Sequence, residues 1–355
     1  MTAIDAWGYF LGAANTLLER RAFQVEHWAA DEVVVQVAGC GLCHTDLGFI
    51  TGQVRTRREL PLIPGHEICG TVIAAGRKFT DRVGQRVIIP AVLPCGECEL
   101  CRAGRDNICQ RQKMPGNDFN GGFASHVVVP GRFLCRLPED LHGFELAELS
   151  VIADAVTTPY QSLVRSGVKD DDLVIVIGVG GIGLYMVQHA KNAGAMVIAL
   201  EIDPDRLAIA TAQGADYGLC TQGMTARDIK QEIKALVRQN SLPEYRWKIF
   251  ETSGSAAGQS VAFALLSFAG TLGIIGFTME KLTLRLSNVM AFDAELFGNW
   301  GCSPNHYPTV VEQVLNGHIK LRENIEVHPL DDINAVVAQA LDHKLQRRAV
   351  LIPGG

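Results

Sequence analysis

Four cysteines lie close together in one short segment, and their spacing is typical of a metal site. The segment "CGECELCRAGRDNIC" contains Cys95, Cys98, Cys101 and Cys109, spaced as C-x2-C-x2-C-x7-C. Four thiolates at this spacing can surround one tetrahedral Zn²⁺ and leave no open position, so they predict a structural zinc lobe over residues 94–110. Free cysteines and an iron–sulfur cluster are the alternatives, although nothing else in the chain indicates electron-transfer partners.

A second group of metal-ligand residue types comes earlier in the chain. Cys43 follows an apolar run, and His66 and Glu67 end the segment "PLIPGHE". A thiolate and an imidazole can share one ion that keeps positions for a third ligand and a substrate oxygen, which is the arrangement of a catalytic zinc. A cysteine and a histidine so far apart are by themselves more often structural than ligands, so this interpretation needs further support.

A glycine-rich segment has the pattern of a dinucleotide-binding loop. It follows the apolar run "LVIVI", precedes a helical pattern, and contains Gly178, Gly180, Gly181, Ile182 and Gly183. G-x-G-x-x-G in this context predicts a tight turn whose backbone approaches a pyrophosphate at a helix N-terminus. Glu201 ends the next apolar run and is expected to accept hydrogen bonds from the adenosine ribose, which favours NAD over NADP. Arg206 is a second candidate for a ribose contact. A glycine-rich turn without a ligand is the alternative.

Composition limits the classes of protein to which the chain can belong. At 355 residues with 48% apolar residues, it is long enough for two domains with buried cores. The net charge of −6 argues against a general nucleic-acid or anionic-membrane binder. Because no positively charged leader and no apolar run of membrane-spanning length are apparent, we expect a cytosolic protein.

The elements that must position these residues fall into three parts. Residues 1–157 consist of short alternating apolar runs broken by Gly, Pro and Asp, which predicts a β-rich domain of small antiparallel strands. Residues 158–297 alternate solid apolar runs with helical stretches, which predicts a doubly wound parallel sheet. Residues 298–355 read as two helices and a final strand that return to the first domain. The expected fold class is therefore α/β.

Five motifs in order resemble one enzyme family over nearly the whole chain. "GCGLCHTDL", "PLIPGHE", the cysteine lobe, "GGFASHVVVP" and the glycine loop resemble the zinc-dependent alcohol dehydrogenases of the medium-chain dehydrogenase/reductase superfamily. The resemblance implies a GroES-like catalytic domain interrupted by a Rossmann NAD-binding domain. It also implies one catalytic and one structural zinc per chain, oxidation of an alcohol with NAD, and a homo-oligomer, with a tetramer favoured.

The resemblance also implies roles for single residues. By motif position, Cys43 and His66 are catalytic-zinc ligands, Thr45 contacts the substrate hydroxyl, Asp46 orients His66, and Glu67 lies behind the metal and can enter its coordination shell. By the same comparison, His44 and Arg348 contact the cofactor pyrophosphate and Thr158 contacts the nicotinamide.

The sequence departs from the family pattern at two positions. Where many members have a cysteine as third zinc ligand, "VIADAVTTPY" offers Asp154, which resembles the carboxylate ligand of some bacterial members. An N-cap for the following helix is the alternative for Asp154. Many members also finish a proton relay with a histidine where this chain has Gly48, so the relay is expected to end through a ribose hydroxyl and water.

The substrate is suggested only by resemblance. Within the family, the sequence most resembles enzymes of anaerobic aromatic degradation that oxidise 6-hydroxycyclohex-1-ene-1-carbonyl-CoA to its 6-oxo product with NAD; a simpler secondary or aromatic alcohol is the alternative. Arg55, Arg57 and Arg58 would then bind the CoA phosphates through paired hydrogen bonds, unless they form an ordinary solvated surface run.

Two other classes of protein have the same general pattern of motifs. One is the zinc-free members of the superfamily that reduce quinones or double bonds with NADPH, against which the intact Cys43, His66 and Glu67 count. The other is a non-catalytic member retained for binding or structure.

Overall fold

The computed structural model describes residues 3–354 and divides into two compact units. The first unit comprises the chain up to Thr157, Gly301–Gly317 and the chain from Leu321 onward; the second comprises Thr158–Trp300 and His318–Lys320. The second unit therefore includes residues 298–300 and 318–320, which lie outside the range 158–297 expected from the sequence. Backbone hydrogen bonding explains the first of these segments, because the Asn299 N–H donates to the carbonyl of Ile274 at 2.9 Å.

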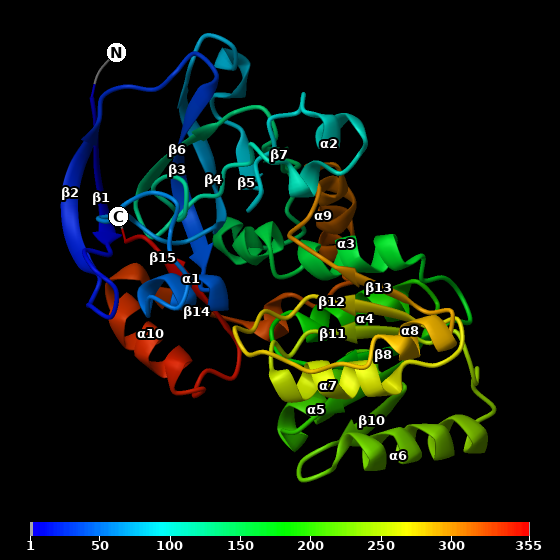
Figure 1. Cartoon of the computed structure of the whole chain (residues 1–355). Helices are drawn as coiled ribbons and strands as arrows, with labels where there is room; N and C mark the ends of the chain where they lie inside the picture. Colours follow the sequence, from blue (N-terminus) through cyan, green and yellow to red (C-terminus); the bar gives the residue numbers. More distant parts are fainter. Residues whose placement is uncertain (1–2, 355) are drawn as a thin grey trace. The chain divides into compact units, whose positions relative to one another are not determined.

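The first unit is built on β-sheets (Figure 1). Strands β1 (Ile4–Phe10) and β2 (Glu19–Val25) form an antiparallel pair. The larger sheet has the order β14-β15-β3-β4-β5-β7, with β6 also paired to β3. Its strands are β3 (Glu32–Gly41), β4 (Glu67–Ala75), β5 (Arg86–Ile89), β6 (His126–Pro130), β7 (Cys135–Arg136), β14 (Ile325–Pro329) and β15 (Arg348–Ile352).

Strand β3 lies at the centre of this unit because both of its faces are packed. Val33, Val35 and Val37 point into the main apolar core, whereas Val34 packs with Val25 of β2. A run of β-branched residues suits such a strand, since neither face meets water. The far end of β3 leads directly into the segment that carries Cys43.

Short helices complete the first unit. They are α1 (His44–Ile50), η1 (Thr80–Arg82), α2 (Glu99–Arg102), η2 (Asp106–Ile108), η3 (Leu146–Ala153), η4 (Pro304–His306), α9 (Tyr307–Leu315), η5 (Arg322–Asn324), η6 (Leu330–Asp332) and α10 (Ile333–Leu341). Helices α9 and α10 and strand β15 correspond to the two helices and final strand expected near the C-terminus. Strand β14 was not expected from the sequence; it pairs in parallel with β15.

The second unit is a doubly wound parallel sheet, as the sequence predicts. The order β10-β9-β8-β11-β12-β13 is parallel throughout. Its strands are β8 (Leu173–Ile177), β9 (Met196–Glu201), β10 (Tyr217–Cys220), β11 (Lys248–Glu251), β12 (Thr271–Ile274) and β13 (Glu295–Gly298). Its helices are α4 (Gly183–Asn192), α5 (Pro204–Ala212), α6 (Ala226–Gln239), α7 (Ala256–Leu265) and α8 (Ser287–Ala291), while α3 (Thr157–Ser166) begins at the junction of the units.

Alternating residues of the central strand explain why helices cover both faces of this sheet (Figure 1). In β8, Ile175 and Ile177 pack with residues of α6 and α7, whereas Val174 and Val176 pack with residues of α4 and α5. Each face of the strand is thus apolar and covered. The glycine loop begins at Gly178, directly after the carboxyl end of β8. In residues 3–354, no helix has the length and apolar character that crossing a membrane requires.

Candidate functional site

Three side chains from separate segments of the first unit converge on one point. Cys43 directly precedes α1, His66 directly precedes β4, and Asp154 follows η3. The Cys43 Sγ lies 3.7 Å and the His66 Nε2 lies 3.5 Å from Asp154 Oδ2. Donor atoms around one tetrahedral zinc lie about 3.3–3.8 Å apart, so these residues fit a single ion. One sulfur, one nitrogen and one oxygen donor leave a fourth position for a substrate oxygen.

Asp46 determines which ring nitrogen of His66 faces this point. Its carboxylate is fully buried, and Oδ1 lies 3.0 Å from His66 Nδ1. The same carboxylate accepts hydrogen bonds from the backbone N–H groups of Cys43 (3.1 Å) and Gly65 (3.1 Å). With Nδ1 as donor to Asp46, Nε2 presents its lone pair to the neighbouring donor atoms, which is how carboxylates orient metal-binding histidines.

The charges around His66 act against the effect of its burial. Burial alone would lower the pKa of His66, but Asp46, Asp154 and Cys43 together raise that pKa well above its ordinary value. An imidazole that is fully buried among anionic groups favours a bound positive charge, which a proton or a metal ion can supply.

Glu67 makes a buried ion pair with Arg348. The Glu67 Oε2 lies 2.8 Å from Arg348 Nε, and Oε1 accepts from Arg348 Nη2 and from the Ala155 N–H at 3.1 Å. Strand β15 brings Arg348 to this position through its pairing with β3. Gly41 of β3 is required by this contact, because a Cβ there would lie 2.1 Å from Glu67 Oε2. One oxygen of Glu67 nevertheless lies within 4.8 Å of the three other donor atoms.

The family resemblance implied a role for each partner of this ion pair: Glu67 near the metal and Arg348 at the cofactor pyrophosphate. Burial raises the pKa of Glu67, and the Arg348 guanidinium opposes that rise. Arg348, which was predicted to contact the cofactor pyrophosphate, has its guanidinium bound to Glu67 and a side chain that is 7% exposed.

Asp154 does not occupy the N-cap position of the helix that follows it. It directly follows η3 as the C-cap of that turn, and α3 begins only at Thr157. The structure also places Cys302 near Asp154, which sequence reasoning did not identify. Burial, followed by the negative charges of Asp154 and Asp106, raises the pKa of the Cys302 thiol well above its ordinary value. Cys302 lies far along the chain in a segment without a metal-binding pattern, so no sequence signal marked it.

The first turn of α1 carries His44, predicted to contact the cofactor pyrophosphate, and Thr45, predicted to contact the substrate hydroxyl. His44 is exposed and Thr45 is half-buried, and both directly follow Cys43. Gly48, one turn later, is buried, and a Cβ there would contact Val54 Cγ2 at 3.4 Å. This is an ordinary van der Waals distance, so the packing alone does not require glycine at the position where other family members have the relay histidine.

The cysteine lobe brings its four sulfur atoms together. Neighbouring Sγ atoms lie 3.5 Å apart for Cys95–Cys109 and Cys98–Cys101, 3.7 Å for Cys98–Cys109 and 3.9 Å for Cys95–Cys101. These distances are too long for disulfides and match the spacing of about 3.8 Å between thiolates around one zinc. A backbone hydrogen bond at Glu97 lowers the pKa of Cys95 to about 6, which favours a thiolate.

The glycine loop of the second unit has the shape expected for binding a pyrophosphate. Gly178 has a φ of +81°, and a Cβ at Gly183 would lie 1.9 Å from the Gly178 carbonyl oxygen, so neither position accepts a larger residue. A Cβ at Gly180 would meet nothing closer than Arg206 Nη1 at 3.9 Å. The loop therefore leaves open space at Gly180, beside a positive charge, where a phosphate can approach the backbone.

Glu201 supports this loop from the end of β9. Its Oε2 accepts a hydrogen bond from the Val179 N–H at 2.8 Å, and its Oε1 accepts from Ile202 (2.8 Å) and Asp203 (3.3 Å). A carboxylate can accept further hydrogen bonds, so a role toward a ribose remains compatible with these contacts. Thr158, predicted to contact the nicotinamide, is buried, and its carbonyl accepts a hydrogen bond from Asn299 Nδ2 at 3.3 Å.

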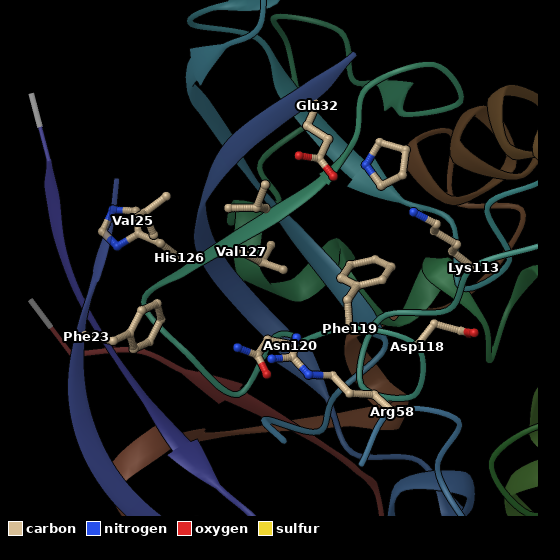
Figure 2. A pocket seen from close by; sticks show the side chains of 12 residues that line it. Phe23, Val25, Glu32, Arg58, Lys113, Asp118, Phe119, Asn120, His126 and Val127 are labelled. Carbon is tan, nitrogen blue, oxygen red and sulfur yellow. The ribbon is translucent and has the colours of Figure 1, made fainter. Parts of the chain in front are cut away.

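The three arginines between the metal motifs have different surroundings. All three are exposed. Arg57 Nη1 lies 3.4 Å from both Asp118 Oδ1 and the Gln112 carbonyl oxygen, so its guanidinium has partners within the chain. Arg58 lines a pocket of about 280 Å³ in the first unit (Figure 2), whereas Arg55 does not.

Two family models match the chain. The alcohol dehydrogenase GroES-like domain matches residues 29–139, and the zinc-binding dehydrogenase domain matches residues 181–316. The first match includes both groups of metal-ligand residues except Asp154, and the second includes part of the glycine loop and Glu201.

Individual proteins are similar over nearly their whole length. An alcohol dehydrogenase of Geobacillus stearothermophilus is 29% identical over 323 residues, covering 90% of this chain and 91% of that protein. A sorbitol dehydrogenase of Bacillus subtilis is 26% identical over 329 residues, covering 91% and 90%. The crystal structure of the alcohol dehydrogenase from Aeropyrum pernix has a TM-score of 0.86 and 27% identity, covering 98% of this chain and all (100%) of that one.

Proposed function

Because the chain belongs to the zinc-type alcohol dehydrogenases of the medium-chain dehydrogenase/reductase superfamily, we propose that it oxidises a secondary alcohol to a ketone with NAD as hydride acceptor. The observation that carries this proposal is the convergence of Cys43, His66 and Asp154 on one point, with His66 oriented by Asp46. Three donors and one free position suit catalysis, whereas the four-cysteine lobe suits a structural ion.

The residues of the site would have different roles in this reaction. A zinc ion bound by Cys43, His66 and Asp154 would supply Lewis-acid chemistry that favours loss of the alcohol proton. Asp46 keeps the His66 Nε2 lone pair directed at the site. The Thr45 hydroxyl accepts the hydrogen bond of the substrate hydroxyl and passes its proton on. Since position 48 is a glycine, no side chain there can take the proton onward, and the ribose hydroxyl of a bound cofactor, with water, would supply that path.

The substrate that we favour is a simple secondary alcohol or a polyol. The relatives reported above are named for alcohols and for sorbitol. The expected CoA thioester rests only on sequence resemblance, and one of its three proposed phosphate ligands, Arg57, is bound to Asp118. We therefore treat 6-hydroxycyclohex-1-ene-1-carbonyl-CoA as the competing substrate.

Metal analysis combined with steady-state kinetics tests the proposal. We expect two zinc ions per chain, matching the two groups of donor residues, and reduction of NAD by cyclohexanol or sorbitol. A much higher kcat/KM for the CoA ester would replace the favoured substrate class. NADPH-dependent quinone reduction without zinc would identify a reductase. The absence of both zinc-dependent turnover and NADH binding would identify a non-catalytic member.

Glu201 is predicted to control the choice between NAD and NADP. Glu201→Ala should lower the ratio of kcat/KM for NAD over NADP by about tenfold to a hundredfold, because it removes a ribose acceptor and a charge that repels a 2′-phosphate. KM for NAD should also rise, since the Val179 N–H loses its acceptor. Glu201→Gln separates charge from size, and Asp205→Ala, which removes a nearby exposed acid, is the control. An unchanged ratio in both Glu201 variants would contradict the role.

A further inference from the structure

Asp154 lies in a short segment between two helical stretches, η3 and α3. It is the C-cap of η3, with φ −143° and ψ −59°, and α3 begins only at Thr157. The Asp154 nitrogen lies 3.4 Å from the carbonyl oxygen of Val151, which is beyond the usual distance of a backbone hydrogen bond. The backbone of this proposed zinc ligand therefore depends on contacts from other parts of the chain.

The hydroxyl group of Tyr307 holds the peptide group that precedes Asp154. Tyr307 begins α9, which packs against η3, and it is completely buried. Its hydroxyl donates a hydrogen bond to the Ala153 carbonyl oxygen at 2.5 Å and accepts one from the Ala91 N–H at 3.3 Å. The Ala153 carbonyl is thus fixed by a side chain that lies 154 residues away in the sequence.

Glu67 holds the peptide group that follows Asp154. The Ala155 N–H donates to Glu67 Oε1 at 3.1 Å, and Arg348 fixes the Glu67 carboxylate by two hydrogen bonds. Thr157 adds a longer contact, since its hydroxyl oxygen lies 3.5 Å from the Asp154 carbonyl oxygen. Buried side chains from β4 and α9 therefore fix the backbone on both sides of Asp154.

The placement of Asp154 matters because its side chain carries one of the three proposed donor atoms. Its Oδ2 lies 3.7 Å from Cys43 Sγ and 3.5 Å from His66 Nε2. Metal sites require donor atoms to lie within about 0.2 Å of their ideal distances from the ion. A shift of the Ala153 peptide group would therefore weaken the site without removing a ligand.

Packing alone does not account for a tyrosine at position 307. Phenylalanine would fill nearly the same space and would not require a hydroxyl group to be removed from water. The buried hydroxyl instead makes two hydrogen bonds to the backbone, and one of them is to the residue directly before Asp154. The contact that distinguishes tyrosine from phenylalanine is therefore the contact next to the proposed ligand.

We propose that Tyr307 is a positioning residue of the catalytic metal site. Its hydroxyl fixes the Ala153 peptide group so that the Asp154 carboxylate faces Cys43 and His66. This inference rests on the proposed function for its set of ligands, but it concerns how firmly the metal is held and not which alcohol is oxidised.

The release of zinc to the chelating dye pyridylazoresorcinol tests the proposal in Tyr307→Phe, which keeps the ring and removes only the hydroxyl. One of the two zinc ions should leave about tenfold to a hundredfold faster than from the unmodified enzyme, which is the usual effect of losing a group that orients a metal ligand. The ion of the cysteine lobe should leave at an unchanged rate, because the two sites share no ligand. Asp154→Ala, which should lack the catalytic ion, identifies the release phase of that ion.

Tyr9→Phe is the matched control. Tyr9 is a buried tyrosine of the same unit, and its hydroxyl donates to Asp331 Oδ1 at 2.8 Å. Its loss should lower the urea midpoint of unfolding about as much as Tyr307→Phe does, because each variant loses a tyrosine hydroxyl contact. It should leave the release of both zinc ions unchanged.

Three results would overturn the proposal: unchanged release of the catalytic ion from Tyr307→Phe, equal acceleration in both tyrosine variants, or equal acceleration for both ions of Tyr307→Phe. An unmodified enzyme with zinc only in the cysteine lobe would overturn both this inference and the proposed function. The expected release pattern in an enzyme that oxidises no secondary alcohol would support the role of Tyr307 and contradict the proposed function alone.

Discussion

Replacing Asp154 by alanine is expected to lower kcat/KM by at least about a thousandfold and to reduce bound zinc from two ions per chain to one. Asp154 Oδ2 lies 3.7 Å from Cys43 Sγ and 3.5 Å from His66 Nε2, whereas the neighbouring Glu67 carboxylate is bound to Arg348. Loss of Asp154 therefore leaves two ligands, too few for a stable site. The cysteine lobe shares no ligand with this site and should keep its ion.

Metal analysis of the purified variant, together with kinetics on the preferred alcohol, measures both effects. Cys109→Ser is the reciprocal control, because it should release the structural ion while the catalytic donors stay in place. Asp154→Cys should restore two zinc ions, since a thiolate can replace the carboxylate. Zinc content that stays at two, or falls to zero, in Asp154→Ala would contradict the proposed ligand sets.

Arg348→Ala should lower the free energy of unfolding by about 3–5 kcal/mol, which is the usual cost of leaving one partner of a buried ion pair unpaired. Glu67 is completely buried and Arg348 nearly so, and two hydrogen bonds join them. Without the guanidinium, the buried Glu67 carboxylate would lose its ion-pair partner while the negative charge of Asp154 stays nearby.

The pH dependence of this loss has a definite sign. Burial already raises the pKa of Glu67, and removing Arg348 takes away the largest effect that lowers it. A carboxyl whose pKa is higher in the folded state than in the unfolded state destabilises the fold at pH above the unfolded value, and protonation relieves the penalty as pH falls. The loss in Arg348→Ala should therefore be larger near about pH 8 than near about pH 5.

Urea unfolding of the variants at both pH values checks this prediction. Arg322→Ala is a matched control: Arg322 makes a similar two-fold contact with Glu148 but is 52% exposed, so its loss should cost about 1 kcal/mol or less. Glu67→Gln/Arg348→Met, which leaves no buried charge, should recover much of the stability. Equal losses in Arg348→Ala and Arg322→Ala would show that burial does not set the strength of the pair.

The sequence by itself determined those features whose chemistry is local. The four cysteines lie within one short lobe, so their spacing was enough to predict a tetrahedral site. The glycine loop was recognisable because a turn, a close backbone approach and a following helix all lie within a few residues, and the geometry of Gly178 and Gly183 agrees with it. Continuous apolar runs separated by helical stretches likewise predicted the parallel sheet, because both faces of β8 are buried.

The tertiary structure decided what depends on partners far apart in the chain. Asp154 lies 111 residues from Cys43, and residue spacing alone did not identify it; family resemblance was needed. Arg348 lies 281 residues from Glu67, and only the pairing of β15 with β3 brings them together. No local sequence pattern identifies the distant partner of a charged residue, because sheet pairing rather than residue spacing brings the two residues together.

The three arginines between the metal motifs also show that local sequence does not identify distant partners. Sequence treated Arg55, Arg57 and Arg58 as one group, since they are neighbours of the same type. The fold separates them: Arg57 binds Asp118, Arg58 faces a pocket with Lys113, and Arg55 takes part in neither. The loop that carries Asp118 is distant in sequence, and its contact with residues 57 and 58 determines that Arg57 is the arginine that pairs with Asp118.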